Sequence, residues 1–135
     1  MEKLTYTVNA ENRTLGRVAS DAASALLGKH SVLFVKHKVL PIEVSIENAG
    51  KIRITEKRLK TTLYRHYTGH PGGLKTATLE ELIAKKGIAE ALRIAVLGML
   101  PKNKLGRSMF KKLKVFSGAE HEHESQQPKV WEPKI

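Results

Sequence analysis

The sequence predicts an α/β fold: a single layered α/β domain with a short, mainly parallel sheet, basic loops and an extended C-terminal tail. Short stretches of alternating polar and apolar residues, typical of strands, are separated by longer stretches with apolar residues every three or four positions, typical of helices. A length of 135 residues is typical of a single domain with one hydrophobic core. We expect one domain over residues 1–118 and a polar tail over residues 119–135.

The first strand and the first helix are predicted at residues 5–10 and 14–30. The first range alternates in polarity, and the second has apolar residues at helical spacing with many alanines, which suggests close packing against a sheet. Asn12 or Thr14 could cap the start of this helix. Gly28 is suited to its end, because glycine readily adopts the left-handed conformation that often follows a helix.

Two further strands are predicted at residues 42–48 and 51–55. Both ranges alternate in polarity, and the turn residues 48–50 would allow the two strands to pair. The glycine-rich residues 64–75 follow. They are predicted to form a loop, because Pro-Gly-Gly is typical of turns.

Two helices are predicted in the C-terminal half, at residues 78–86 and 88–100. Thr78 and Glu81 have the spacing of a capping box, which marks the start of the first. The second has an apolar face and ends at Pro101.

The rest of the chain is predicted to be less regular. Residues 102–113 are expected to form a basic loop and a short helix, and residues 114–118 the last strand. The tail is polar and contains two prolines, so we expect it to be extended.

The positive charge of the chain is concentrated in one segment. The net charge is +11, and residues 57–114 contain 14 Lys and Arg against three Glu, so this segment accounts for the whole excess. Lysines present only for solubility would be mixed with acids along the chain. The clustering favours a polyanionic partner, either nucleic acid or an acidic membrane surface. Few aromatic residues, no repeated hydrophobic and basic face, and no apolar stretch long enough to span a bilayer argue against the membrane.

Three basic stretches are candidates for contacts with nucleic acid. Residues 64–75 combine cations with tyrosine and histidine rings, which can stack on bases, and with glycines, which let a backbone approach phosphates. Residues 101–114 contain six cations and no acid, and residues 28–38 form a smaller third stretch. RNA is favoured over duplex DNA, because the cations lie largely in predicted loops and no helix-turn-helix or zinc-finger pattern is present.

Metal binding and catalysis are the alternatives to RNA binding. His66 and His70 are four residues apart, but their stretch has no helical pattern and no carboxylate, and its cations would repel a metal ion. His121 and His123 are two residues apart, so in an extended segment their side chains would point to the same side and both could contact one ion or one phosphate. The chain has no cysteine, no phosphate-binding loop motif, no dinucleotide fingerprint and no evident pair of catalytic acids. We therefore expect no enzyme activity, no resident metal, no cofactor and no small-molecule substrate.

Four motifs resemble the bacterial large-subunit ribosomal protein thirteen family: residues 14–20 (TLGRVAS), 28–30 (GKH), 65–73 (RHYTGHPGG) and 96–123 (VLGMLPKNKLGRSMFKKLKVFSGAEHEH). The likeness covers nearly the whole chain, and the last motif is highly specific. It implies a three-layer α/β/α protein of the large ribosomal subunit that contacts large-subunit ribosomal RNA and enters the particle early in assembly. It also implies neighbouring large-subunit ribosomal proteins as partners and a location on cytoplasmic ribosomes.

The candidate RNA-binding residues come from these motifs and from the basic stretches. They are Arg17, Lys29, His30, Tyr64, Arg65, His66, Tyr67, Thr68, Gly69, His70, Gly72, Gly73, Lys75, Lys102, Asn103, Lys104, Gly106, Arg107, Lys111, Lys112 and Lys114, with His121 and His123 as weaker candidates.

The chain departs from the family pattern in two turns and in the tail. Residues 36–43 replace an acidic turn of the Asp-Thr-Gly-Asp type, and residues 55–58 lack the glycine of a Thr-Gly-Asn-Lys turn. The resemblance therefore does not define the conformation of these two turns. The tail matches only in the Gln-Gln-Pro at 126–128. Trp131 is either a loose aromatic residue or a docking contact with RNA or a neighbouring protein.

Two other functions remain open on the sequence alone. A free-standing RNA-binding regulator would carry the same basic stretches but act away from ribosomes. A metal-dependent enzyme would use His66 and His70.

Overall fold

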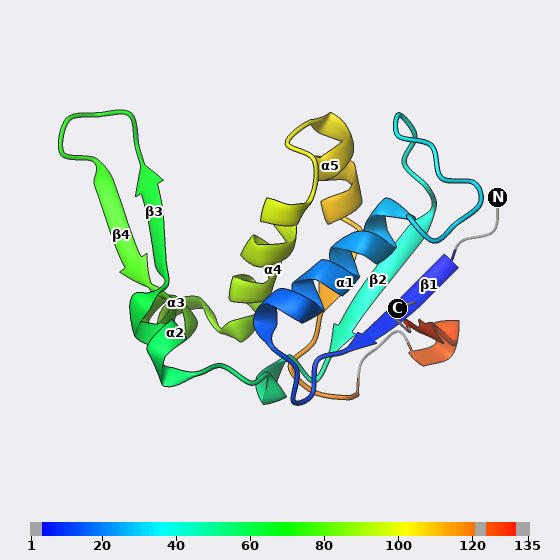
Figure 1. The fold of residues 1–135 in the computed structure, drawn as a ribbon, viewed down its shortest axis with the longest axis horizontal. Helices are drawn as coiled ribbons and strands as arrows, with labels where there is room; N and C mark the ends of the chain where they lie inside the picture. The colour runs from blue at the N-terminus through cyan, green and yellow to red at the C-terminus, as the bar shows by residue number, and fades with distance from the viewer. Residues whose placement is uncertain (1–3, 121–123, 132–135) are drawn as a thin grey trace.

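The computed structural model describes residues 4–120 and 124–131. Its centre is a four-stranded sheet in the order β5–β2–β1–β6, in which every neighbouring pair is parallel (Figure 1). The strands are β1 (Leu4–Asn9), β2 (Ile42–Glu47), β5 (Leu113–Val115) and β6 (Lys129–Val130). The predicted α/β class and the parallel central sheet are confirmed.

Helices α1 (Leu15–Leu27) and α4 (Ile88–Met99) pack against each other over one face of the sheet (Figure 1). The main core lies between these layers, where Val18 and Leu26 of α1 are buried together with Ile46 of β2. The alanines of α1 are also buried, and their small side chains let the helix pack closely, as the sequence predicts.

Both ends of α1 lie where the sequence places them. Thr14 occupies the N-cap position. Gly28 adopts the left-handed conformation (φ 70°), and its N–H donates to the carbonyl of Ala25 at 2.9 Å.

A second unit projects away from the sheet and is called the hairpin unit here. It consists of α2 (Glu56–Thr61), β3 (Leu63–Tyr67), β4 (Leu74–Thr78) and α3 (Leu79–Lys86), with β3 and β4 paired antiparallel (Figure 1). A small separate core formed by Leu79, Leu82 and Ala91 joins this unit to α4. The hairpin unit is therefore held to the main body by apolar packing.

The predicted capping box at the start of α3 is confirmed. The Thr78 hydroxyl accepts a hydrogen bond from the Glu81 N–H at 3.2 Å, and the Glu81 carboxylate accepts one from the Thr78 N–H at 3.2 Å. Two N–H groups at the helix start thus find partners.

The prediction of a loop over residues 64–75 is wrong in part: residues 64–67 and 74–75 lie in β3 and β4, and only residues 68–73 form the turn between the strands. Positive φ angles at Gly69 (88°) and Gly72 (73°) allow the chain to reverse at its tip. This stretch has few β-branched residues, so its sequence does not indicate strands. The ladder is stabilised by cross-strand pairing rather than by intrinsic strand preference.

The prediction of a strand over residues 51–55 is also wrong. Asn48 has a positive φ of 56° and leads into a 3-10 turn, η1 (Ala49–Lys51), so the chain leaves the sheet. Arg53 makes only an isolated bridge with Thr14, and α2 follows.

The C-terminal elements largely follow the prediction. Helix α5 (Lys104–Phe110) lies within the expected helical range. The strand predicted at 114–118 is shorter and starts earlier, as β5. The carbonyls of Phe116 and Gly118 instead accept hydrogen bonds from the N–H groups of Ala49 and Asn48, at 3.1 and 3.0 Å.

Trp131, which follows β6, packs on the chain itself. Its ring stands edge-on to Tyr6 and His30, with centroid distances of 5.1 and 4.6 Å. The backbone N–H of Trp131 donates to the Thr7 carbonyl at 2.8 Å. These contacts give Trp131 a structural role that the sequence left open. Within the described parts of the chain, no helix has the length and apolar character needed to cross a bilayer.

Candidate nucleic-acid interface

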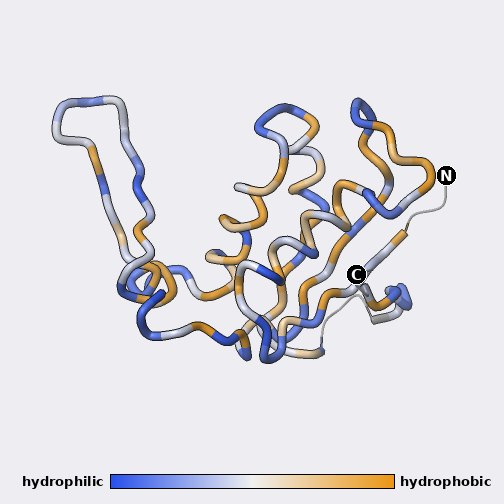
Figure 2. Tube along the Cα trace, viewed as in Figure 1, coloured by the Kyte–Doolittle hydropathy of each residue, from blue (hydrophilic) through white to orange (hydrophobic). Residues whose placement is uncertain are grey.

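Two of the predicted basic stretches lie on either side of α4 and line two hollows that share Ile94. One hollow lies between the hairpin unit and α4, and the other between α4 and α5. Together they are called the α4 trough. Figure 1 shows the hairpin on one side of α4 and α5 beyond its C-terminal end. Figure 2 shows hydrophilic segments at the hairpin tip and at the turn into α5. Stretches that are distant in the sequence thus come together in one surface.

The hairpin forms the first wall of the trough. His66 lies opposite Lys75, and Tyr64 lies opposite Ala77. Directly opposed residues of an antiparallel pair point to the same side of the sheet. All four line the hollow from one face of the hairpin, and the intervening pair Arg65 and Thr76 also contributes to the lining.

Tyr64 is the most enclosed polar group of this wall. Burial raises the pKa of its hydroxyl above the ordinary value. The phenol is protonated at neutral pH, as it would be at the ordinary pKa of 10.0, and can donate a hydrogen bond to a phosphate or a base.

Two lysines of α3 complete the hollow beside the hairpin, and the sequence analysis did not single them out. Lys85 and Lys86 are exposed in the last turn of α3 and face the trough next to Leu82. Cations in a last helical turn also interact favourably with the helix dipole, so their position alone gave no signal of binding. Only the fold shows that they lie near Lys75.

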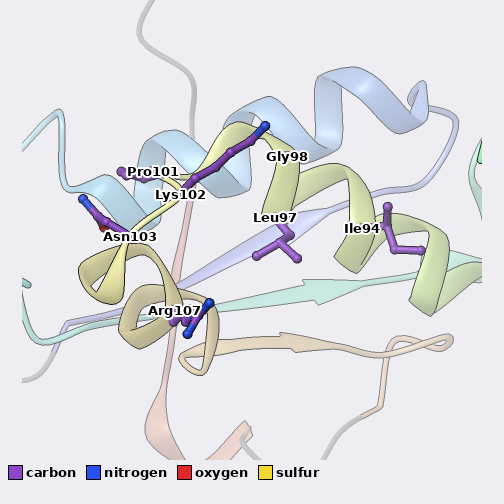
Figure 3. Close-up of a pocket in the computed structure, with 7 residues that line it drawn as sticks. All are labelled: Ile94, Leu97, Gly98, Pro101, Lys102, Asn103 and Arg107. Atoms are coloured by element: carbon purple, nitrogen blue, oxygen red, sulfur yellow. The ribbon is translucent and has the colours of Figure 1, made fainter. Parts of the chain in front are cut away.

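The second hollow, of about 440 Å³, lies between α4 and α5 (Figure 3). Ile94, Leu97 and Pro101 give it an apolar floor, and Leu97 is 45% exposed. Lys102 and Arg107 lie at its edge. An apolar floor with cations at the edge suits a nucleobase attached to a charged backbone.

Asn103 and Gly106 stabilise the start of α5, which forms the other side of this hollow. The Asn103 side chain caps α5 by accepting a hydrogen bond from the Gly106 N–H at 2.9 Å. Gly106 is buried, and a Cβ there would lie within 2.9 Å of the Pro101 carbonyl carbon. Both residues were predicted to contact RNA, and the structure gives each a packing role that places Arg107.

The cations of the trough have no acidic partner among the described residues. The ion pairs formed within the described ranges lie elsewhere: Arg13 with Asp21, Lys51 with Glu11, and Lys114 with Glu43. Like charges that share a surface raise its potential, which attracts a polyanion.

The tip of the hairpin presents the remaining residues of the first stretch. The Thr68 N–H donates to the Gly73 carbonyl at 3.2 Å, and the Gly73 N–H donates to the His70 carbonyl at 3.0 Å. Tyr67, His70 and Gly72 are exposed there or on the adjoining strand. Arg65 is exposed on β3 and also lines the hollow beside α4. The tip can therefore reach a partner without rearrangement of the main body.

Several other predicted residues lie away from the trough. The Lys112 ammonium donates to the Leu40 carbonyl at 2.7 Å, and Lys114 lies 3.8 Å from Glu43. Lys29 and His30 follow the C-terminal end of α1, with His30 against Trp131. Residues outside both hollows include Arg17, Lys104 and Lys111, all exposed. His121 and His123 lie outside the described residues.

The histidine pair offered for metal binding is split between strand and turn. His66 belongs to β3 and His70 to the hairpin tip. Across residues 4–120 and 124–131, no group of three or more potential ligand side chains gathers in one place.

The sequence model of the family described as "Ribosomal protein L13" matches residues 3–122 of the 135. The chain belongs to the ribosomal protein L13 family. The α4 trough and the hairpin unit both lie inside the matched range. The resemblance stated from the sequence motifs is confirmed.

Relatives in the L13 family match over most of their length. "Large ribosomal subunit protein uL13" of Syntrophomonas wolfei is 46% identical over 129 residues, covering 96% of this chain and 89% of the relative. The protein of the same name from Natranaerobius thermophilus is 47% identical over 133 residues, covering 98% and 92%. That of Vibrio cholerae is 46% identical over 125 residues, covering 93% and 87%.

Proposed function

We propose that this chain is a structural constituent of the large ribosomal subunit, that it binds large-subunit ribosomal RNA, and that it supports early assembly of the subunit. Membership of the ribosomal protein L13 family supports this function, which is structural rather than enzymatic. The observation that carries the RNA-binding part is the α4 trough, where two basic stretches meet without acidic partners among the described residues.

In this proposal the RNA backbone follows the cations of the trough. Lys75 and Lys85 on one side of α4, and Lys102 and Arg107 on the other, neutralise phosphates. A base rests on the apolar floor beside Leu97. Neutralising roughly six phosphates makes affinity fall by about two to three orders of magnitude between low and moderate salt.

The proposed RNA-binding set keeps the residues expected from the sequence and adds Lys85 and Lys86. The contacts of Asn103 and Gly106 support an indirect contribution, through the placement of Arg107. The division into an RNA-binding domain over residues 1–118 and a tail over residues 119–135 stays a prediction.

The partners that follow are large-subunit ribosomal RNA and neighbouring large-subunit proteins, on ribosomes in the cytoplasm. Val32 and Leu33, which are 101% and 60% exposed, support the protein contacts, because exposed apolar groups often mark interaction sites. Crosslinking in intact particles, followed by peptide mapping, tests both kinds of partner. A free-standing regulator would instead fail to sediment with large subunits in high salt.

The decisive experiment uses charge reversal at the start of α5. Lys104→Glu and Arg107→Glu, singly and together, should reduce incorporation into large subunits while the isolated protein stays folded, since both side chains are exposed. Lys129→Glu in β6 is the control for the single variants, because it makes the same charge change as each of them at the far edge of the sheet. Undiminished incorporation of the double variant would refute the proposed function of this surface.

A further inference from the structure

A third hollow, about 450 Å³ in volume, lies between the start of α1 and the start of α2. It shares no lining residue with the α4 trough. Its lining consists of three arginines and two threonines: Thr14, Arg17, Arg53, Thr55 and Arg58. It is called the arginine hollow below.

Backbone pairing brings these arginines together from distant parts of the sequence. Arg53 forms a parallel bridge with Thr14, and its N–H donates to the Arg13 carbonyl at 3.0 Å. The Asn12 N–H donates to the Lys51 carbonyl at 3.1 Å, so the two segments run alongside each other. This pairing carries Arg53 to the first turn of α1, where Arg17 lies.

The three guanidinium groups have no acidic partner among the residues the structure describes. Asp21, one turn beyond Arg17 on α1, pairs with Arg13. Glu56 starts α2 but does not line the hollow. Three cations around one space repel each other, and an anion between them would remove that repulsion.

The start of the 13-residue helix α1 adds uncharged donors to the same space. Thr14 and Thr55 occupy N-cap positions, but neither side chain makes a capping hydrogen bond. The first N–H groups of a helix have no partner within the helix, and they favour anions. Gly16, in the first turn of α1, has no atom within 4 Å of its Cβ position, so the space beside it is open.

We propose that the arginine hollow binds a phosphate group of the RNA backbone. Arginine fits this ligand, since its planar guanidinium group donates two parallel hydrogen bonds to phosphate oxygens. The inference rests on the proposed function, because it takes ribosomal RNA as the source of the phosphate. The bound phosphate joins α1 of the main body to α2 of the hairpin unit and so fixes the hairpin relative to the sheet.

The first test uses the free protein and inorganic phosphate. Titration followed by 15N–1H spectra should shift the amide signals of Gly16 and Arg17 with saturation. The double variant Arg53→Gln/Arg58→Gln should abolish these shifts. The control Lys57→Gln/Lys60→Gln removes the same number of charges from the same segment, outside the hollow, and should keep them. Absence of saturable shifts in the wild type would overturn the proposal.

The second test measures affinity for large-subunit ribosomal RNA at several salt concentrations. Loss of one phosphate contact should make the slope of log K against log salt less steep by about 0.7 to 0.9 in the arginine variant. It should also weaken binding roughly tenfold, with no matching change in the lysine control.

The outcomes separate this proposal from the proposed function. If wild type, arginine variant and lysine control bind RNA alike, the arginine hollow is not an RNA site, and phosphate-induced shifts would then show an adventitious ion only. If the wild type itself does not bind the RNA, the proposed function fails and this inference fails with it.

Discussion

Gly106→Ala tests the geometry on which the α4–α5 hollow depends. A Cβ at Gly106 would overlap the carbonyl oxygen of Pro101 and lie within 2.9 Å of its carbonyl carbon. Both are backbone atoms, so no change of rotamer can relieve the contact. Helix α5 must move away from the end of α4, and Arg107 moves with it.

The expected loss of stability follows from two opposing terms. Overpacking of a buried site costs about 1 to 3 kcal/mol, and the deep overlap places this site near the upper end. The better helix propensity of alanine offsets up to about 1 kcal/mol. We expect a net loss of about 2 kcal/mol. With an unfolding entropy of about 2.1 cal/mol/K per residue over 135 residues, Tm falls by about 7 °C.

Gly98→Ala is the matched control, since Gly98 lines the same hollow but has no atom within 4 Å of its Cβ position. Alanine there should raise the unfolding free energy by about 0.5 to 1 kcal/mol, or Tm by about 2 to 4 °C. Thermal unfolding followed by circular dichroism compares both variants with the wild type. If Gly106→Ala unfolds at or above the wild-type temperature, the close approach of α5 to Pro101 is wrong, and so is the placement of Arg107 at the trough.

Three further variants test other contacts. Thr78→Ala removes the cap of α3 and should lower the unfolding free energy, measured by urea titration, by about 1 kcal/mol. Thr78→Ser keeps a capping hydroxyl and should retain most of this stabilisation. Trp131→Ala should lower it by about 1 to 3 kcal/mol through loss of two ring contacts, and an unchanged midpoint would argue against the packing of the tail. The raised pKa of Tyr64 means that the folded state keeps a proton which the unfolded chain loses, so stability is full below the ordinary pKa of 10.0 and falls as pH rises above it. Unfolding measured from pH 9 to 11 should show a shallower fall for Tyr64→Phe, and parallel curves would contradict this reading.

Elements governed by local contacts were predictable from the sequence. The start of α3 follows from two residues three positions apart, Thr78 and Glu81, whose side chains meet within one turn. The end of α1 follows from the backbone freedom of Gly28. The excess of positive charge in residues 57–114 likewise needed no coordinates, because charge is a property of composition.

Elements that depend on partners far along the chain were predicted less well. Residues 51–55 alternate like a strand, but the chain leaves the sheet at Asn48, and Arg53 pairs beside α1 instead. The β3–β4 ladder forms in a glycine-rich stretch whose local signals favour a loop. In both places pairing across the structure outweighs local preference.

The sequence by itself determined the α/β class and the grouping of the cations in a few stretches, and it predicted a polyanionic partner. Only the tertiary structure decided which cations share a surface. Packing of α4 brings the hairpin and α5 to one trough, and backbone pairing carries Arg53 to Arg17. The physical reason is that a binding surface depends on distances between side chains, and those distances are set by packing between segments that lie far apart in the chain.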